Sequence, residues 1–271
     1  MNFDSNLAWK QASGAVSANR EVVLALAGVF FMLPQLAFAI FFPQPEPAAG
    51  MSEQQMVQMV TAYYSSIMPM LIPMALIQAL GTLALLRLLD GSRRPTVGEA
   101  IKGGLRGVVP YLLAQLISGF VLALVALAVI GLLGALAGMA GMFVGVAIVA
   151  AITVFVAVRL SLTAAVVAVE QATNPIAALS RSWKLTAGNT TRLLTFYGLF
   201  IVAFIVLLIM VNVLIGIPLA LLASDHVAMI VEALVGSALS ALMALYLVAI
   251  IAASHRQLAG NTHEADSAPF I

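Results

Sequence analysis

Six stretches of the chain are each long and apolar enough to cross a lipid bilayer, and no other feature limits the fold as much. A helix needs about 20 apolar residues to cross about 30 Å of hydrocarbon. Strands of a membrane barrel would be short and would alternate polar with apolar residues, whereas these stretches are apolar on every face. The sequence therefore predicts an all-α polytopic membrane protein, a single integral domain over residues 1–271. The six predicted spans are about 22–42, 67–89, 108–133, 142–169, 193–215 and 227–253.

Composition excludes a soluble globule and several other classes of protein. Hydrophobic residues make up 63% of the chain and charged residues 8%, against about 45–50% and about 25% in typical soluble domains. The net charge is +1 and no basic run exceeds two residues, so we expect no nucleic-acid partner. The chain has no cysteine, which excludes disulfides, thiolate catalysis and cysteine-ligated metals.

The basic residues predict the orientation in the membrane. Ten of the twelve Lys and Arg residues fall in four segments on one predicted side. The other two, Arg87 and Arg159, lie within snorkelling reach of that side, and the loops on the opposite side carry neither Lys nor Arg. By the positive-inside rule, both termini are predicted to be cytoplasmic. The four basic segments are residues 1–21, 90–107, 170–192 and 254–271, the last being a cytoplasmic tail.

The first span has an alternative interpretation as a cleavable signal peptide. Lys10 and Arg20 precede an apolar run in which residues 37–39 loosely resemble a cleavage site. The charged region before the run is unusually long, and the apolar run continues past that site to Phe42. We therefore expect the span to be retained. Cleavage would leave the orientation of the other five spans unchanged.

Three short amphipathic segments adjoin the spans on the predicted cytoplasmic side. Thr96 and Glu99 form a capping box that opens one of them. Asn174 as N-cap, with Pro175 at the first helical position, opens another. Short amphipathic helices joined directly to spans are expected to lie in the plane of the interface. The predicted interfacial helices are about 5–19, 96–107 and 175–188, the last two with glycine stops at Gly107 and Gly188.

The last two interfacial helices suggest an internal duplication. The repeated unit is a span, a basic interfacial helix and a second span, formed by spans two and three and again by spans four and five. Both units run in the same direction, so the duplication would be parallel rather than inverted. At one constant offset, Thr96, Ala100, Ile101 and Arg106 match Asn174, Ala178, Leu179 and Lys184.

The second unit resembles a known family. The segments 159–162, 169–170 and 174–189, followed by a span, are similar to the membrane domain of some glycerophosphoryl diester phosphodiesterases and to stand-alone YciC-like bacterial inner-membrane proteins. The resemblance implies a bacterial inner-membrane location and a link to glycerophospholipid metabolism. In the fused members a separate soluble domain performs the hydrolysis. Only eighteen residues follow Ala253, so we expect that domain to be absent and no catalytic residue to be carried over.

The residues themselves also offer no catalytic constellation. Metal-dependent hydrolysis of a phosphodiester needs clustered carboxylates and usually histidines. The eleven acidic residues are scattered, and His226 lies on the opposite predicted side from the other two histidines. No metalloprotease helix, phosphate-binding loop or nucleophile elbow is present, and His255 is interpreted as part of a basic helix end. We therefore predict no enzymatic activity, no metal and no cofactor.

Basic and aromatic residues near the predicted cytoplasmic surface are candidate contacts for anionic lipid headgroups. Each Lys or Arg there contributes about 1 kcal/mol of attraction to an anionic surface. Arg159 has two interpretations: it snorkels to phosphates or pairs with Glu170 or Asp90, or it binds a headgroup inside the bundle. The candidate headgroup contacts are Lys102, Arg106, Arg159, Arg181, Trp183 and Lys184.

Asn212 and Glu232 form a candidate intramembrane polar site near the opposite surface, because charge in hydrocarbon is costly and often functional. They could form an interhelical hydrogen bond, line a small vestibule, or hold a proton or cation on a transport path. Two functions stay open. One is a non-enzymatic protein that organises or senses anionic glycerophospholipids, and the other is a transporter of a lipid or small amphiphile. A homo-oligomer or a protein partner is also left open.

Overall fold

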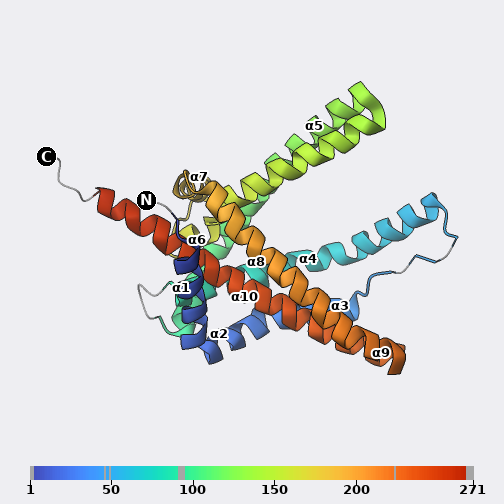
Figure 1. Cartoon of the computed structure of the whole chain (residues 1–271), viewed down its shortest axis with the longest axis horizontal. Helices are drawn as coiled ribbons and strands as arrows, with labels where there is room; N and C mark the ends of the chain where they lie inside the picture. Colours follow the sequence, from blue (N-terminus) through green and yellow to red (C-terminus); the bar gives the residue numbers. More distant parts are fainter. Residues whose placement is uncertain (1–2, 46, 49, 91–94, 223, 267–271) are drawn as a thin grey trace.

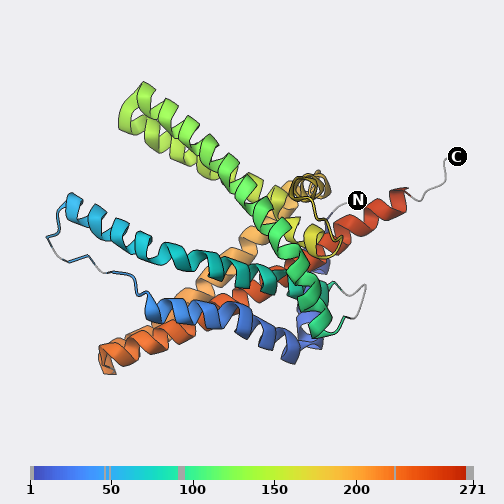
Figure 2. The same cartoon turned by 180° about the vertical axis from the view of Figure 1, so that it is seen from behind.

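The computed structural model describes residues 3–45, 47–48, 50–90, 95–222 and 224–266, and within these ranges all regular structure is helical. The long helices converge at one end and spread apart at the other (Figures 1 and 2). The elements are α1 (Ser5–Ala18), α2 (Arg20–Ala27), η1 (Gly28–Met32), α3 (Leu33–Phe41), α4 (Glu53–Leu89), α5 (Val97–Leu160), α6 (Thr163–Ala168), α7 (Pro175–Leu185), α8 (Thr190–Val211), η2 (Asn212–Gly216), α9 (Ile217–Leu222) and α10 (Asp225–Asp266).

The described residues contain five helical stretches that are long and apolar enough to cross a membrane. This confirms the predicted class, a helical chain whose apolar helices fit an integral membrane protein. Large apolar side chains such as Phe143 and Leu127 are more than two-thirds exposed, as expected where lipid rather than water surrounds the helices. The five stretches are Arg20–Phe41, Glu53–Leu89, Val97–Ala168, Thr190–Leu219 and His226–Gly260.

Helix α5 folds back on itself and forms a hairpin of two long arms (Figure 1). The chain reverses at Ala137 and Gly138, the second of which has φ 59° and ψ −140°. Only glycine adopts that region without strain, because it has no Cβ. Three residues later, a Cβ on Gly141 would overlap the backbone carbonyl of Leu133. These glycines therefore let the two arms meet in a tight turn.

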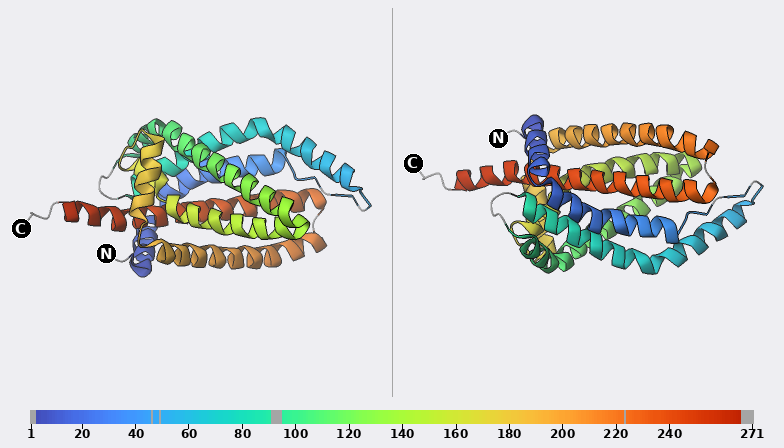
Figure 3. Two further views of the ribbon diagram at one scale, coloured as in Figure 1. Left: turned by 90° about the horizontal axis from the view of Figure 1, so that it is seen from above. Right: turned by 90° about the horizontal axis from the view of Figure 1, so that it is seen from below.

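The core lies at the end where the helices converge. All six residues of α6 are buried there, where α6 packs against α4, α5, α7 and α10. Helices α1 and α7 lie across the long helices at the same end (Figure 3). The largest side chains in this core come from α4, α8 and α10, joined by a residue just before α6. The fully buried leucines and isoleucine are Leu83, Leu85, Leu86, Leu162, Leu193, Leu245 and Ile250.

The capped helices begin where the sequence predicts. The Thr96 hydroxyl accepts a hydrogen bond from the Glu99 amide, and the Glu99 carboxylate accepts one from the Thr96 amide. These two bonds form the capping box of α5. Asn174 accepts from the amides of Ile176 and Ala177 at the start of α7, and Gly188 takes a positive φ of 78° just after α7 ends. Helix α1 covers most of the predicted helix 5–19.

Several helices extend beyond the predicted limits. The predicted stop at Gly107 is wrong, because α5 continues through it. A Cβ there would lie 3.0 Å from Val167 Cγ1, so this glycine permits close packing rather than ending the helix. Helix α4 begins at Glu53, well before the predicted span 67–89, because Ser52 and Gln55 form a capping box. The predicted tail 254–271 begins as a continuation of α10 to Asp266.

Candidate functional site at the basic end

The six candidate headgroup residues lie at the same end of the bundle. Lys102 and Arg106 are on the first turns of α5, Arg159 is at its last turn, and α7 carries Arg181, Trp183 and Lys184. The hairpin returns the end of α5 to the region of its start, and α7 packs there (Figures 2 and 3). We call this end, defined by the five cations among these residues, the basic end.

Burial divides the candidates into two groups. The side chains of Lys102, Arg106 and Lys184 are exposed and make no hydrogen bond or ion pair with a described residue. Trp183 is 39% exposed. Arg159 is buried, with 9% of its surface exposed, and Arg181 is partly buried in an ion pair. The first group is positioned to meet an external ligand, whereas the second contacts other parts of the protein.

Arg159 has an unusual environment for a buried cation. Its guanidinium carbon lies 4.4 Å from the centre of the Trp183 ring. Its Nη1 donates to Thr190 Oγ1 at 3.4 Å, and its buried Nε has no hydrogen-bond partner within the described part of the chain. The backbone carbonyl of Arg159 accepts from Ser182 Oγ at 3.0 Å and from Thr186 Oγ1 at 3.1 Å. These bonds fix α7 against the end of α5.

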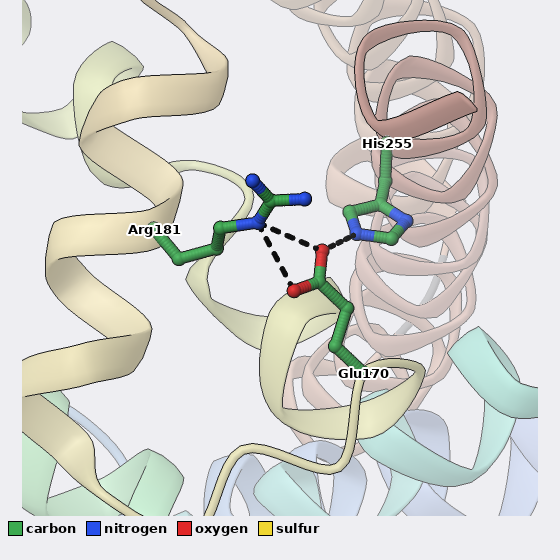
Figure 4. Close-up of polar contacts among 3 residues, drawn as sticks. All are labelled: Glu170, Arg181 and His255. Atoms are coloured by element: carbon green, nitrogen blue, oxygen red, sulfur yellow. Dashed lines mark hydrogen bonds and ion pairs between the residues drawn. The ribbon is translucent and has the colours of Figure 1, made fainter. Parts of the chain in front are cut away.

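Glu170 joins three segments of the basic end (Figure 4). Arg181 Nε on α7 lies 3.3 Å from Oε1 and 3.1 Å from Oε2 of Glu170, and His255 Nε2 on α10 lies 2.9 Å from Oε1. An ionised carboxylate only accepts hydrogen bonds, so His255 carries a proton on Nε2. The side chain of His255 is only 4% exposed. This cluster connects α7 and α10 through Glu170, which lies two positions after the end of α6.

The Glu170 cluster corrects two interpretations from the sequence. Glu170 pairs with Arg181 and His255 rather than with Arg159. Asp90, the other carboxylate considered for Arg159, lies beside Arg256, whose Nη1 donates to the Asp90 carbonyl at 3.0 Å. His255 is not merely part of a basic helix end. The only signal in the sequence for this pair is that Glu170 and His255 each follow a predicted span on the same side.

The environment of Glu170 makes the cluster sensitive to acid. Burial raises the pKa of Glu170, but the hydrogen bond from His255 and the charge of Arg181 together outweigh it, so the pKa lies below its usual value. A carboxyl group with a lowered folded-state pKa stabilises the fold above its unfolded pKa of about 4.3, and this stabilisation is lost as the pH falls through the lowered value.

We therefore expect Glu170→Gln to lower the free energy of unfolding by about 1 kcal/mol at pH 7, where the carboxylate is 30% exposed and partly screened by solvent. The difference from the wild type should disappear below the lowered pKa, because the wild-type carboxyl is then neutral too. Denaturation in detergent at several pH values measures this. Glu21→Gln, at an exposed glutamate in α2, is the control and should change little. An equal difference at all pH values would contradict the argument.

Other arginines of the basic end hold backbone carbonyls rather than presenting their charge. Arg87 Nη1 donates to the Ala168 carbonyl at 2.8 Å, where α6 ends. Arg256 Nη1 also donates to the Leu89 carbonyl at 2.9 Å, at the end of α4. Cations at helix C-termini satisfy free carbonyls and interact favourably with the helix dipole. From the sequence alone, Arg87 and Arg256 are predicted only as charges that set the orientation.

The structure does not bring Asn212 and Glu232 into a described hydrogen bond. Asn212 begins η2, is exposed, and its Nδ2 donates to the Leu208 carbonyl of the preceding turn at 2.9 Å. Glu232 is exposed on α10. The interhelical bond considered for this pair is therefore replaced by a bond within one helix.

A wholly apolar cavity lies between α3 and α4, away from the basic end. Its volume is about 180 Å³, slightly larger than a cavity of about 150 Å³ that is known to stay dry and to accept benzene. Two prolines, one from each helix, contribute to its wall. The lining residues are Pro34, Ala37, Phe38, Phe41, Phe42, Met70, Pro73, Met74 and Ile77.

Fold and site together define an all-helical protein that fits a membrane and gathers cations at one end of its bundle. The chain belongs to the family described as a domain of unknown function, DUF7847, whose model matches residues 8–258. No curated protein and no solved structure matches the chain.

Proposed function

We propose that the protein is a non-enzymatic, six-span protein of the bacterial inner membrane that binds and organises anionic glycerophospholipids at its basic end. The observation that carries this proposal is the gathering of three exposed cations, Lys102, Arg106 and Lys184, at the same end of the bundle as the exposed Trp183. None of the three has an ion-pair partner among the described residues. Cations near the surface attract anionic headgroups, and tryptophan favours the interface between headgroups and hydrocarbon. The loops at the opposite end carry neither Lys nor Arg.

The turn of α5 at Gly138 supports the six-span arrangement. It divides one 64-residue helix into two arms, each long enough to cross about 30 Å of hydrocarbon. Counting the arms separately adds one span to the five apolar stretches. The positive-inside rule then puts the basic end and both termini in the cytoplasm.

The proposal also includes an internal duplication of the unit made of a span, a basic helix and a second span, and a relationship to the family that the second unit resembles. Thr96 and Asn174 each accept a hydrogen bond from the amide three residues further on, at the start of the basic helix of each unit. This shared feature supports a parallel duplication, although only Thr96 forms a reciprocal capping box. The first basic helix continues directly into its span, whereas α7 is separated from the helices on both sides. The similarity to the membrane domain of glycerophosphoryl diester phosphodiesterases adds the link to glycerophospholipids.

Native mass spectrometry of the purified protein tests the proposal. The protein would be extracted in an uncharged detergent and mixed with equal amounts of phosphatidylglycerol and phosphatidylcholine. We expect phosphatidylglycerol to be retained preferentially, and we expect high salt to weaken that preference, because salt screens exposed charges. Equal retention of both lipids at low salt would contradict the proposal.

The apolar cavity between α3 and α4 favours a second candidate function, transport of a lipid or small amphiphile through the bundle. Such a transporter would use the cavity for an apolar chain and Glu232 as an intramembrane charge. The test is the flux of a fluorescent phospholipid across reconstituted vesicles. Loss of that flux in Glu232→Gln, with lipid binding intact, would favour transport over organisation. An absence of flux in the wild type would exclude it.

A further inference from the structure

Arg159 is a buried cation without a carboxylate partner among the described residues. Its neighbours are an aromatic ring and a hydroxyl group, from Trp183 and Thr190. Glu170, the carboxylate nearest in sequence, is held by Arg181 and His255. A buried charge that lacks a counter-ion is strongly unfavourable, and near a membrane such a residue usually marks a functional site. An anion from outside the chain would supply the missing charge.

One edge of the guanidinium group of Arg159 has no protein partner among the described residues. Thr190 Oγ1 donates to the Thr186 carbonyl at 3.2 Å and can therefore accept from Arg159 Nη1. The unpartnered Nε shares the other side of the group with Nη2, and these two donors form the parallel pair that binds two oxygens of a phosphate. Thr190 thus orients the arginine, and the Nε–Nη2 edge has no hydrogen-bond partner among the described residues. Because Nε is buried, a ligand reaches this edge only when the Trp183 ring moves aside.

The surroundings of this edge suit an anion that carries an apolar chain. The ring of Trp183 lies over the guanidinium and also meets the ring of Phe155 at 5.9 Å, edge to face. Trp183 is 39% exposed and Phe155 is 48% exposed, so the charge lies directly below an apolar outer surface. A free inorganic anion would gain nothing from that surface, whereas a phospholipid would place its phosphate on Arg159 and its chains along the rings.

We propose that Arg159 binds the phosphate group of one glycerophospholipid through its Nε–Nη2 edge, beneath Trp183. This site rests on the proposed function and deepens it, since it adds one lipid held at a defined position to the exposed cations that attract headgroups. The shared chemistry is a phosphate-bearing anion, which a lipid or free phosphate could supply. Because the Trp183 ring covers the guanidinium, phosphate binding shifts the ring and changes its fluorescence.

The fluorescence of Trp183 can report on this site without interference once the other tryptophan is replaced. It has two tryptophans, and the other, Trp9, stacks on Tyr246 with ring centres 5.9 Å apart. Trp9→Phe therefore leaves Trp183 as the sole indole. In maltoside detergent this protein would be titrated with phosphatidylglycerol, with diacylglycerol as the lipid without phosphate, and with sodium phosphate. We expect a saturable change with phosphatidylglycerol at one lipid per protein, and none with diacylglycerol.

The titrations have distinct outcomes. A response to phosphatidylglycerol alone supports the site and assigns its ligand to a lipid headgroup. An equal response to sodium phosphate supports the site and assigns it to a free anion. No response to either, or the same response to diacylglycerol, overturns it, and this result needs no variant of Arg159. If phosphatidylglycerol preference persists in mass spectrometry while Trp183 does not respond, only this inference fails.

Variants in the Trp9→Phe background then test the arginine itself. Arg159→Gln should raise the midpoint of the phosphatidylglycerol titration at least about tenfold, and Arg159→Lys should raise it by less, because lysine keeps the charge but loses the paired donors. Arg20→Gln, an exposed arginine at the start of α2, is the matched control and should leave the midpoint unchanged. Equal midpoints in all three variants would overturn the proposal.

Discussion

Replacing Lys102, Arg106 and Lys184 together by glutamine is expected to reduce the preference for phosphatidylglycerol over phosphatidylcholine by about 100-fold. All three side chains are exposed and lack ion-pair partners among the described residues, so their full charge is available to headgroups. Each such cation contributes about 1 kcal/mol of attraction, and about 3 kcal/mol corresponds to two orders of magnitude. Titration of the purified variant with each lipid gives the ratio of the two association constants.

The matched control for this experiment preserves every charge. In Lys102→Arg, Arg106→Lys and Lys184→Arg combined, the same positions stay cationic while the side chains change. The wild-type preference should persist in that protein, because surface attraction depends on charge rather than on the paired donors of arginine. If the glutamine variant retains the wild-type preference, or if the charge-preserving variant loses it, these residues do not select lipids by charge.

Gly141→Leu is expected to destabilise the fold by about 3 kcal/mol or more. A Cβ at this position would overlap the backbone carbonyl of Leu133, and backbone cannot rotate away as a flexible side chain can. Overpacking of this kind typically costs about 1–3 kcal/mol, with larger values where backbone must move. The two arms of α5 would have to separate near the turn. Unfolding in mixed micelles of sodium dodecyl sulfate measures the change.

Gly131→Leu is the control for that prediction. Gly131 lies on the first arm of the same hairpin, and a Cβ there would meet nothing within 4 Å. The added leucine would face outward, where an apolar side chain is compatible with lipid. Its free energy of unfolding should remain close to that of the wild type. Equal destabilisation by the two substitutions would show that close approach at Gly141 does not hold the hairpin together.

The class of fold could be predicted from the sequence because it depends on local patterns. Long apolar stretches predict helices in a membrane, and the cap residues Thr96, Asn174 and Pro175 act within a few positions of themselves. The same local signals placed the starts of α5 and α7. Helix α4 begins before the predicted span because its start depends on the capping box at Ser52, which the hydropathy of the apolar run does not reflect.

The contacts of the candidate site could not be predicted in the same way, because they join distant parts of the chain. Glu170 and His255 are 85 positions apart, so no local pattern in the sequence connects them. Gly107 could end a helix or allow another side chain to pack closely against the helix. The sequence does not decide between these roles, because Val167, which packs against Gly107, is brought there only by the fold. Sequence likewise identified Arg159 as a costly charge, but its position beneath Trp183 follows from how α7 crosses the end of α5.

The accessibility of single cysteines tests the central claim most directly, namely that all cations face the cytoplasm. The chain has no native cysteine, so Lys102→Cys, Lys184→Cys and Glu53→Cys can each be labelled without further changes. We predict that a membrane-impermeant maleimide labels Glu53→Cys in intact spheroplasts, whereas Lys102→Cys and Lys184→Cys react only after the membrane is opened. Labelling of Lys102→Cys or Lys184→Cys in intact spheroplasts would contradict the account.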